Sequence, residues 1–415
     1  MKTQRRFLDI HWVREQFPAL DYPFIFMDNA GGSQITGKSI QYIQDYFHRM
    51  NVQLGATYHA SAEAGKQMER THSRIGQLLN AGDSGQIVIG PSTTMLLRIL
   101  SICISKLWKP GDEVIVSHAD HEANISCWKD LHPLGIQIKI WHPNPETHQL
   151  EIDDLKKLLT ERTRLVAMVH VSNVIGSIHP VSEIAKWVHE AGALLCVDGV
   201  AFTPHRIPDL QALDVDFYVF STYKTFGPHQ AIMYGKKSLL DHMPGINHFF
   251  IQSTPYKFQP GNFNFELTYS MNGFLDYYDD LYHHHFHGHP TDILSRNHQI
   301  NQLISRYEEK LAAPLLEFLQ SRRDIRVIGS SNVSGDVRVP TVSFVHESLS
   351  SEQIVTGTEP YRIGIRYGDF YAHHLINELG LRNQSGVVRV SMVHYNAIEE
   401  VLLLIKALDE ILFSS

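Results

Sequence analysis

A lysine, Lys224, stands shortly after an apolar run that ends at Phe220. The run Phe217–Phe220 is typical of a buried strand, and the Gly-Pro pair at 227–228 is typical of a turn. Because burial disfavours the charged form of an amine, a lysine held at the end of such a strand can be neutral and nucleophilic. Schiff-base chemistry needs such a lysine. The alternative is a lysine whose head group reaches the solvent.

An aspartate closes another predicted buried strand upstream of this lysine. Asp198 directly follows the apolar run Ala193–Val197. Enzymes that use pyridoxal 5′-phosphate (PLP) need a lysine for the Schiff base and an acid that keeps the pyridine nitrogen protonated. Asp198 and Lys224 together therefore indicate PLP chemistry.

Strands and helices alternate through most of the chain. The predicted strands are residues 86–90, 113–117, 137–141, 165–171, 193–197, 217–220 and 231–234. This alternation predicts an α/β fold with a mainly parallel sheet that is covered on both faces. In such sheets ligands bind beyond the carboxyl ends of the strands. The polar residues that fall at these ends are Thr93, Thr94, His121, Asn173, Asp198, Ser221 and Lys224.

A hydroxyl-rich turn, Ser92 to Thr94, separates the first of these strands from a predicted helix that runs to about Leu107. Free N–H groups and the helix dipole at such a turn favour a phosphate group. A helix cap with nothing bound is the alternative for an isolated turn of this kind.

Three segments are predicted from the changes in pattern along the chain. Residues 1–25 form an arm that packs on a smaller domain, residues 26–295 form a large PLP-binding domain, and residues 296–415 form a small α+β domain. Within the large domain, the small residues after Asp28 allow close approach of the backbone to a ligand. Residues 241–295 are predicted to be irregular and rich in aromatic side chains, and a helix is predicted over residues 371–379.

Histidines cluster between Tyr282 and His289. Histidine is a common metal ligand, but the run lacks both a fixed tetrahedral spacing and a nearby pair of cysteines. We therefore expect a solvated segment between helix and loop, and no metal.

Composition limits the function further. The 415 residues carry a formal net charge of -8, with 43% hydrophobic and 19% charged residues, which is ordinary for a globular protein. The negative charge and the lack of a basic run argue against a nucleic-acid partner. The sequence contains neither a signal-peptide core nor a membrane-spanning stretch, and its three cysteines make no disulfide framework. We expect a cytoplasmic protein.

As a set, the motifs resemble the class V aminotransferase family of PLP enzymes, and within it the cysteine-desulfurase-like branch. The resemblance spans residues 24 to 410. The motifs that carry it are Asp28-Asn-Ala, Thr93-Thr94, Asp120-His121-Glu-Ala-Asn124, Ser172-Asn-Val-Ile-Gly176, Val197-Asp-Gly, Ser221-Thr-Tyr-Lys224 with Gly-Pro228, and Arg389-Val-Ser with Tyr395-Asn396. The resemblance implies PLP-dependent transferase fold type I and a homodimer with its active site at the subunit interface.

The resemblance also implies a role for each site residue. Lys224 would form the internal aldimine and then carry protons, Asp198 would pair with the pyridine nitrogen, His121 would stack on the ring, and Asn173 would bond the ring hydroxyl. The residues implied at the phosphate are Thr93, Thr94, Ser221, Tyr223 and, from the partner subunit, Asn262. The residues implied at the substrate are Arg389 as carboxylate clamp, Arg366 as a second anion contact, Ala30 and Asn173.

This sequence departs from the family pattern where desulfurases carry their catalytic cysteine. Tyr371 stands in that loop, and no cysteine lies beyond Cys196. Ala201 replaces a frequent glutamine, and Asn262 replaces a threonine that contacts the phosphate. A tyrosine cannot take up sulfur as a thiolate does, so these departures leave the sulfur acceptor open.

The expected function is that of a PLP-dependent enzyme acting on a small amino acid, with desulfuration or C–S lysis favoured. Desulfuration with an external thiol as the sulfur acceptor is one form that this reaction can take. The alternatives are an aminotransferase, a racemase or epimerase, and a PLP-binding partner protein without catalysis.

Overall fold

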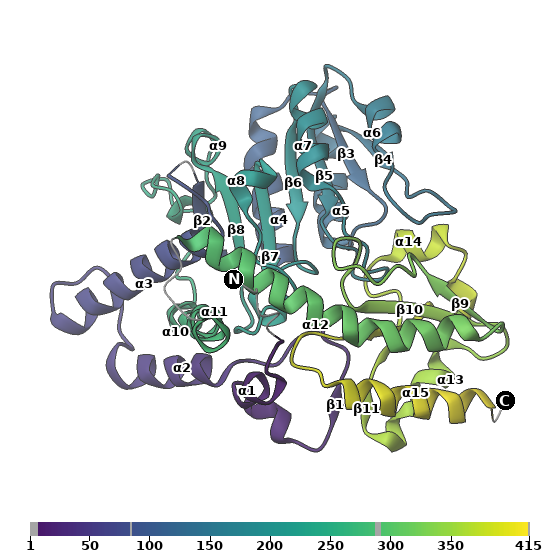
Figure 1. The fold of residues 1–415 in the computed structure, drawn as a ribbon. Coiled ribbons are helices and arrows are strands. Elements are labelled where there is room, and N and C mark those ends of the chain that lie inside the picture. Colours follow the sequence, from purple (N-terminus) through teal and green to yellow (C-terminus); the bar gives the residue numbers. More distant parts are fainter. Residues whose placement is uncertain (1–6, 84, 287–291, 414–415) are drawn as a thin grey trace, which may run out of the picture.

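The computed structural model describes residues 7–83, 85–286 and 292–413, and its centre is a large sheet (Figure 1). Among the described residues the sheet has the strand order β2-β8-β7-β6-β5-β3-β4. Strand β8 runs antiparallel to both of its neighbours, and the pairs from β7 to β4 are parallel. The strands are β2 (Gly85–Gly90), β3 (Glu113–Ser117), β4 (Gln137–Trp141), β5 (Thr163–Val169), β6 (Leu194–Asp198), β7 (Phe217–Ser221) and β8 (Ala231–Lys236). The predicted mainly parallel α/β sheet is confirmed.

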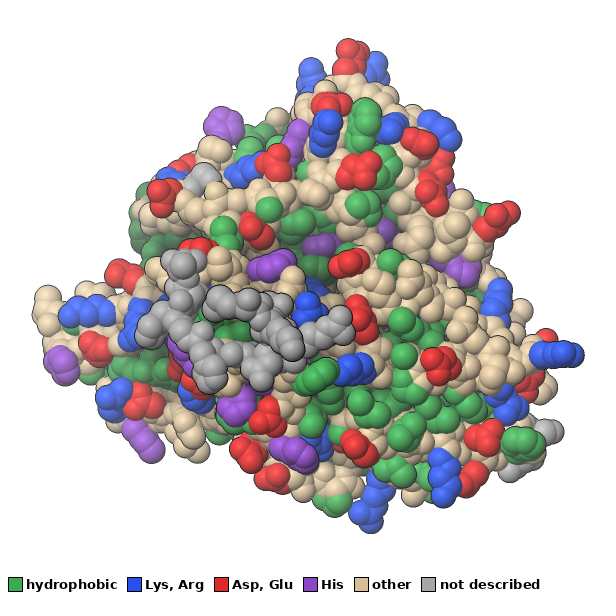
Figure 2. Space-filling view, in the orientation of Figure 1, with side chains coloured by type: hydrophobic (Ala, Val, Ile, Leu, Met, Phe, Trp, Pro, Cys, Tyr) green, Lys and Arg blue, Asp and Glu red, His purple; other side chains and the backbone are tan. Residues whose placement is uncertain are grey.

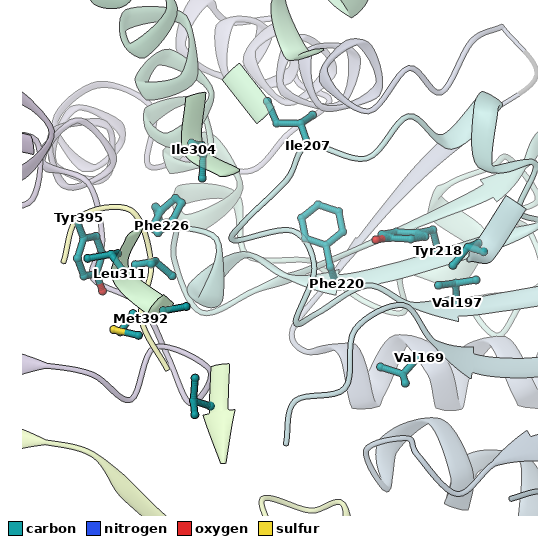
Figure 3. Packing of buried hydrophobic residues seen from close by; sticks show 14 of the residues in the cluster. Val169, Val197, Ile207, Tyr218, Phe220, Phe226, Ile304, Leu311, Met392 and Tyr395 are labelled. Carbon is teal, nitrogen blue, oxygen red and sulfur yellow. The ribbon is translucent and has the colours of Figure 1, made fainter. Parts of the chain in front are cut away.

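Side chains of β7 alternate between two hydrophobic cores, as the period of a strand requires. Tyr218 and Phe220 point into one core, and Phe217 and Val219 point into the other. Figure 3 shows Tyr218 and Phe220 in the first core, which also contains Val197 of β6. Burial of each such side chain contributes about 1.5–3 kcal/mol, so the strand that ends at Ser221 is fixed on both faces.

Helices cover both faces of the large sheet. One face packs against α4 (Thr93–Ile104), α5 (Ala123–Lys129) and α9 (Lys237–His242). The other face packs against α3 (His59–Leu78), α6 (Ile152–Leu158), α7 (Val181–Glu190), α8 (Leu210–Leu213), α11 (Asn272–His285) and the long α12 (Ile293–Ser321). This layered arrangement leaves the carboxyl ends of the parallel strands to form a site.

The C-terminal part contains an antiparallel sheet with the order β12-β13-β10-β9. Its strands are β9 (Ile325–Ile328), β10 (Thr341–His346), β12 (Arg366–Gly368) and β13 (Val387–Ser391), and its helices are α13 (Ser351–Thr358), α14 (His373–Glu378) and α15 (Ile398–Phe413). Near the start of the chain, β1 (Ile25–Phe26) pairs in parallel with β11 (Ile363–Gly364). Residues 25–26 therefore lie beside the C-terminal part, and the predicted domain boundaries stay predictions.

The N-terminal helices are α1 (Ile10–Glu15) and α2 (Gly37–Arg49). Arg14 of α1 donates to Glu400 of α15 at 2.9 Å, while the backbone N–H of Asp9 donates to His285 of α11 at 2.8 Å. The first residues of the described chain thus contact both the C-terminal part and the large-sheet part.

The prediction of irregular chain over residues 241–295 is wrong for most of its second half. Residues 265–285 form α10 (Phe265–Ser270) and α11. Tyr277, Tyr278 and Leu281 on α11 are buried, whereas the residues that are not buried are Asp276, Asp279, Asp280, His283 and His284. These positions recur at helical spacing along one side, so the sequence did contain an amphipathic pattern that the prediction missed. Of the histidine run, His283–His285 end α11, whereas residues 287–289 lie outside the described residues.

The predicted helix over residues 371–379 is shorter in the structure, where α14 begins at His373. Phe370 and Tyr371 have φ angles of 53° and 59°. Bulky side chains rarely adopt this left-handed conformation, so the chain before α14 is a tight loop.

None of the described helices combines the length and apolar character that crossing a bilayer requires. On the face shown in Figure 2, acidic and basic side chains are interspersed, and hydrophobic side chains gather over the region of α12 and α15.

Candidate active site

A cavity lies at the carboxyl ends of β5, β6 and β7, beside the start of α4. The sequence-predicted residues that line it are Thr93, Thr94, His121, Asn173, Asp198, Ser221, Tyr223 and Lys224. The structure therefore brings together every predicted cofactor residue except Asn262.

Lys224 ends a short 3-10 turn, Thr222–Lys224, that directly follows β7. Its side chain is buried, with only 9% of the residue exposed. Burial, with the nearby positive charge of Arg389, lowers the pKa of Lys224 from 10.5 to about 8, although Asp198 and Asp28 oppose this shift. The amine is therefore far more often neutral near neutral pH than a solvated lysine.

Asp198 is the last residue of β6 and is buried in the same cavity. Its Oδ1 accepts a hydrogen bond from the backbone N–H of Val200 at 2.8 Å. Burial raises the pKa of Asp198 to about 6, although this hydrogen bond and the Lys224 charge lower it. A buried carboxylate in this state gains from a cationic partner, because the partner offsets the loss of solvation.

His121 lies in the loop between β3 and α5. Its Nδ1 accepts from the backbone N–H of Ala123 at 3.0 Å, which places the ring proton on Nε2. Burial and the Lys224 charge lower the pKa of His121 to about 4, so the ring is neutral. The ring centroid of Tyr371 lies 5.2 Å away, so the loop that contains Tyr371 lies next to this histidine.

Asn173 connects the cavity to the same loop. Its Nδ2 donates to the carbonyl of Phe370 at 2.9 Å, and its Oδ1 is buried without a hydrogen-bond partner among the described residues. An unpaired buried oxygen costs about 1–3 kcal/mol. A hydroxyl group bound in the cavity would remove this cost.

Hydroxyl groups gather where β7 meets the start of α4. The Oγ1 of Thr93 lies 2.8 Å from the Oγ of Ser221, and Thr94 also lines the cavity. The ring of Tyr223 stacks on His229 with centroids 4.6 Å apart. The first-turn N–H groups of α4 and these hydroxyls are donors of the kind that bind a phosphate.

Arg389 of β13 lies next to the cavity and is almost completely buried, with 2% exposed. It donates to Oδ1 of Asp28 at 2.6 Å and to the carbonyl of Asn173 at 3.1 Å, and its guanidinium lies 3.7 Å from the ring centroid of Phe370. Asp28 thus occupies one donor of the guanidinium through a single carboxylate oxygen, while the buried Nε donor is left without a partner among the described residues.

The remaining predicted residues lie farther out. Arg366 is exposed, and its NH1 lies 3.9 Å from Oδ2 of Asp28. The backbone N–H of Ala30 donates to Ser391 at 2.9 Å. The side-chain amide of Asn262 exchanges hydrogen bonds with that of Gln53 at 3.0 and 3.2 Å, outside the cavity.

Asp28, Phe370 and Asp120 shape the site but were not predicted as site residues. Asp120 is fully buried, and burial raises its pKa to about 8 while Ser117 and Asn124 hydrogen bond to it. Its position directly before His121 was the available signal. The partnership of Asp28 with Arg389 joins residues far apart in sequence and gave no local signal.

All three cysteines are buried, and none of them belongs to the loop that contains Tyr371. Burial raises the pKa of Cys103 to about 11 and raises the pKa values of Cys127 and Cys196 further. The chain therefore offers no exposed thiolate that could take up sulfur.

The residues of the cavity fit PLP. A buried amine, an opposing carboxyl group, a neutral imidazole, an unpaired amide oxygen and a hydroxyl-lined helix start match the aldehyde, pyridine nitrogen, ring face, hydroxyl and phosphate of that cofactor.

Comparisons with known proteins agree with this fit. The family described as Aminotransferase class-V matches residues 25–404. The aminotransferase-like protein FGM3 of Gibberella zeae is 39% identical over 96% of this chain and 98% of its own length. The cysteine desulfurase-like protein ustD of Aspergillus flavus is 35% identical over 97% of this chain and 91% of its own.

Among solved structures, the cysteine desulfurase CsdA from Escherichia coli is 26% identical and superposes with a TM-score of 0.83, covering 98% of this chain and 99% of that chain. These similarities extend over the whole cavity and both sheets. The chain therefore belongs to the class V aminotransferase family of PLP-dependent enzymes, in its cysteine-desulfurase-like branch.

Proposed function

We propose that this chain is an enzyme that removes a β-substituent from a small amino acid, by desulfuration or C–S lysis. The observation that carries the proposal is the buried amine of Lys224 in one cavity with Asp198 and His121, next to the carboxylate-binding fork of Arg389. The family membership supports the cofactor, and the names of the desulfurase relatives support the choice of reaction.

PLP, when bound, withdraws electrons from the substrate α-carbon. The chain supplies the remaining groups. The amine of Lys224 takes and returns a proton at that carbon, because a pKa of about 8 suits proton transfer near neutral pH. Asp198 would hold the proton on the pyridine nitrogen, and the neutral ring of His121 would pack against the cofactor ring.

Arg389 orients the substrate through its α-carboxylate. An incoming carboxylate would replace Asp28 on the guanidinium, because its two oxygens could accept from both NH2 and the unpaired Nε, whereas Asp28 uses one oxygen. Arg366, exposed beside Asp28, supplies a second anion contact at the entrance. A non-catalytic PLP-binding protein would have no use for a buried fork of this kind.

Tyr371 and the buried cysteines favour either elimination of the sulfur as sulfide, with pyruvate and ammonia as the other products, or its transfer to an external thiol, which becomes a persulfide as alanine forms. Tyr371 is 67% exposed and its ring centroid lies 5.2 Å from that of His121, but a phenol cannot carry sulfur as a thiolate does. Transamination and racemisation use the same groups and remain the alternative outcomes.

The proposed enzyme is a homodimer with its active site at the interface. Met95 and Ile102 on α4 and Phe249 and Phe250 are exposed large hydrophobic residues, which supports a covered surface. Asn262 lies outside the cavity of its own chain, as expected for a residue that contacts the phosphate of a partner.

The proposed function is tested by mixing the PLP-loaded protein with cysteine, cysteine conjugates, selenocysteine and alanine, one at a time. Sulfide, alanine, pyruvate and ammonia are assayed together in the presence of excess added thiol while the visible spectrum is recorded. Formation of alanine with transfer of the sulfur to the added thiol as a persulfide, from which a second thiol releases sulfide as a disulfide forms, would indicate desulfuration. Sulfide or thiol with pyruvate and ammonia would indicate lysis. An unchanged spectrum with every amino acid would refute the proposal.

We expect PLP capture by the apoprotein to accelerate as pH rises through about 8. The neutral amine is the reactive form, and with a pKa of about 8 roughly one lysine in ten is neutral at pH 7. Stopped-flow absorbance measures this rate. Arg389→Met removes a positive charge and should move the midpoint to higher pH. A midpoint near pH 10.5 in both proteins, as for an ordinary lysine, would contradict the burial of Lys224 beside Arg389 as the cause of its lowered pKa.

Arg389→Lys should raise the KM for the amino acid about 10- to 100-fold and also lower kcat. Lysine keeps the charge but loses the paired donors, and charged hydrogen bonds are worth about 1.5–3 kcal/mol. Steady-state kinetics with the amino acid and with the amine that lacks its carboxylate measure the effect. The wild type should strongly prefer the amino acid, and equal kinetics for the two compounds would exclude Arg389 as the clamp.

A further inference from the structure

Two histidines and a glutamate meet beside the active-site loop, outside the cavity. His118 directly follows β3, His142 directly follows β4, and Glu378 ends α14. The Nδ1 atoms of both histidines contact the same carboxylate oxygen, Oε1 of Glu378, and the distance for His142 is 2.7 Å. The three potential ligand atoms all lie within 4.8 Å of one another. In Figure 1, α14 lies beside the ends of β3 and β4.

We propose that His118, His142 and Glu378 bind one divalent transition-metal ion of the zinc class, which joins the C-terminal part of the chain to the edge of the large sheet. Two imidazoles and one carboxylate, with a fourth position for water, are an established ligand set for Zn²⁺.

The geometry needs only a small adjustment to admit the ion. Zn²⁺ lies about 2.0–2.2 Å from nitrogen and oxygen ligands, so tetrahedral neighbours are separated by about 3.3 Å. The Glu378 carboxylate and the two histidines would therefore separate, by about 0.6 Å from the present contact of His142 and by somewhat more from the shorter contact of His118. The side chain of His142 is 62% exposed, whereas the side chains of His118 and Glu378 are 12% and 27% exposed.

The surroundings hold His118 in place. The His374 ring stacks on His118 with centroids 4.2 Å apart, and the backbone N–H of His118 donates to the carbonyl of Trp141 at 3.0 Å. The Nε2 of His374 lies 3.1 Å from the Nζ of Lys129, so this histidine is engaged elsewhere.

The proposed metal site would limit the movement of the loop that contains Tyr371, next to His121. Glu378 belongs to the helix that begins two residues after Tyr371, and the carbonyl of Tyr371 accepts from the backbone N–H of Glu122 at 2.7 Å. A metal between β3, β4 and α14 would therefore restrain this loop at its C-terminal side.

The test uses PLP-loaded protein produced without a histidine tag and treated with a chelator. Zn²⁺ is then titrated against a chromophoric chelator, and bound metal is counted by elemental mass spectrometry. We expect one ion per chain in the wild type and at least about a 100-fold loss of affinity in His142→Ala and in Glu378→Gln, since even outer-sphere changes cost 10- to 100-fold. Co²⁺ in place of Zn²⁺ should show the visible absorption of a four-coordinate site, and this absorption should disappear in both variants.

Two controls separate this site from other histidines. His132→Ala removes an exposed imidazole outside the cluster and should leave affinity and stoichiometry unchanged. The double variant His283→Ala and His284→Ala should also bind as the wild type does. Loss of Zn²⁺ in this double variant but not in His142→Ala would place the metal at the histidine run and overturn the proposal. Failure of the wild type to retain Zn²⁺ would show that hydrogen bonds alone hold the cluster.

Discussion

Replacement of Lys224 by alanine should abolish covalent attachment of PLP and lower turnover by at least about 1,000-fold. Among the described residues that line the cavity, Lys224 supplies the only amine, and its pKa of about 8 makes it both nucleophile and base. Absorbance of the purified protein reports the attachment, and steady-state assays report the turnover.

Two further variants show whether this loss comes from the amine itself. Lys224→Arg keeps a positive charge but cannot form a Schiff base, so it should fail as Lys224→Ala does. Lys236→Ala removes a lysine at the end of the neighbouring strand β8, which pairs with Asp214 at 2.9 Å. This variant should keep both the covalent attachment of PLP and the turnover of the wild type. Turnover retained by Lys224→Ala would refute the assignment of the cavity as the active site.

Asp198→Asn should lower kcat about 100- to 1,000-fold while PLP affinity changes much less. The amide has the shape of the acid but cannot carry the negative charge that holds a proton on the pyridine nitrogen, and loss of one such electrostatic contact typically costs this much. Steady-state kinetics and PLP titration separate the two effects.

Asp120→Asn is the matched control for this variant. Asp120 is equally buried, but its pKa of about 8 keeps it protonated at pH 7, so an amide replaces it with little electrostatic change. We expect less than about a tenfold loss, because no charge is removed. Equal losses in the two variants would mean that Asp198 acts through packing and not through its charge.

The parts of the site that sequence predicts well are those that follow directly after apolar runs. Asp198 and Lys224 end or follow β6 and β7, whose side chains are buried on both faces, so a polar residue there is conspicuous. Thr93 and His121 were identified in the same way. The parallel sheet then brings these strand ends together, as its topology requires.

The parts that sequence could not predict depend on contacts between distant segments. The pairing of Asp28 with Arg389 and the three-residue cluster at Glu378 join separate elements, and no local pattern marks them. Helix α11 is a different case, because its polar residues do recur at helical spacing and the pattern was available in the sequence. The left-handed conformation of Tyr371, which brings its ring over His121, follows from the surrounding structure and not from a turn-forming residue.

Borohydride reduction of the PLP-loaded protein, followed by peptide mass spectrometry, tests the central claim most directly. Reduction fixes the cofactor to the amine that holds it. The structure predicts a single modified peptide that contains Lys224. A modification found on a different lysine, or none at all in protein saturated with PLP, would contradict the account of this site.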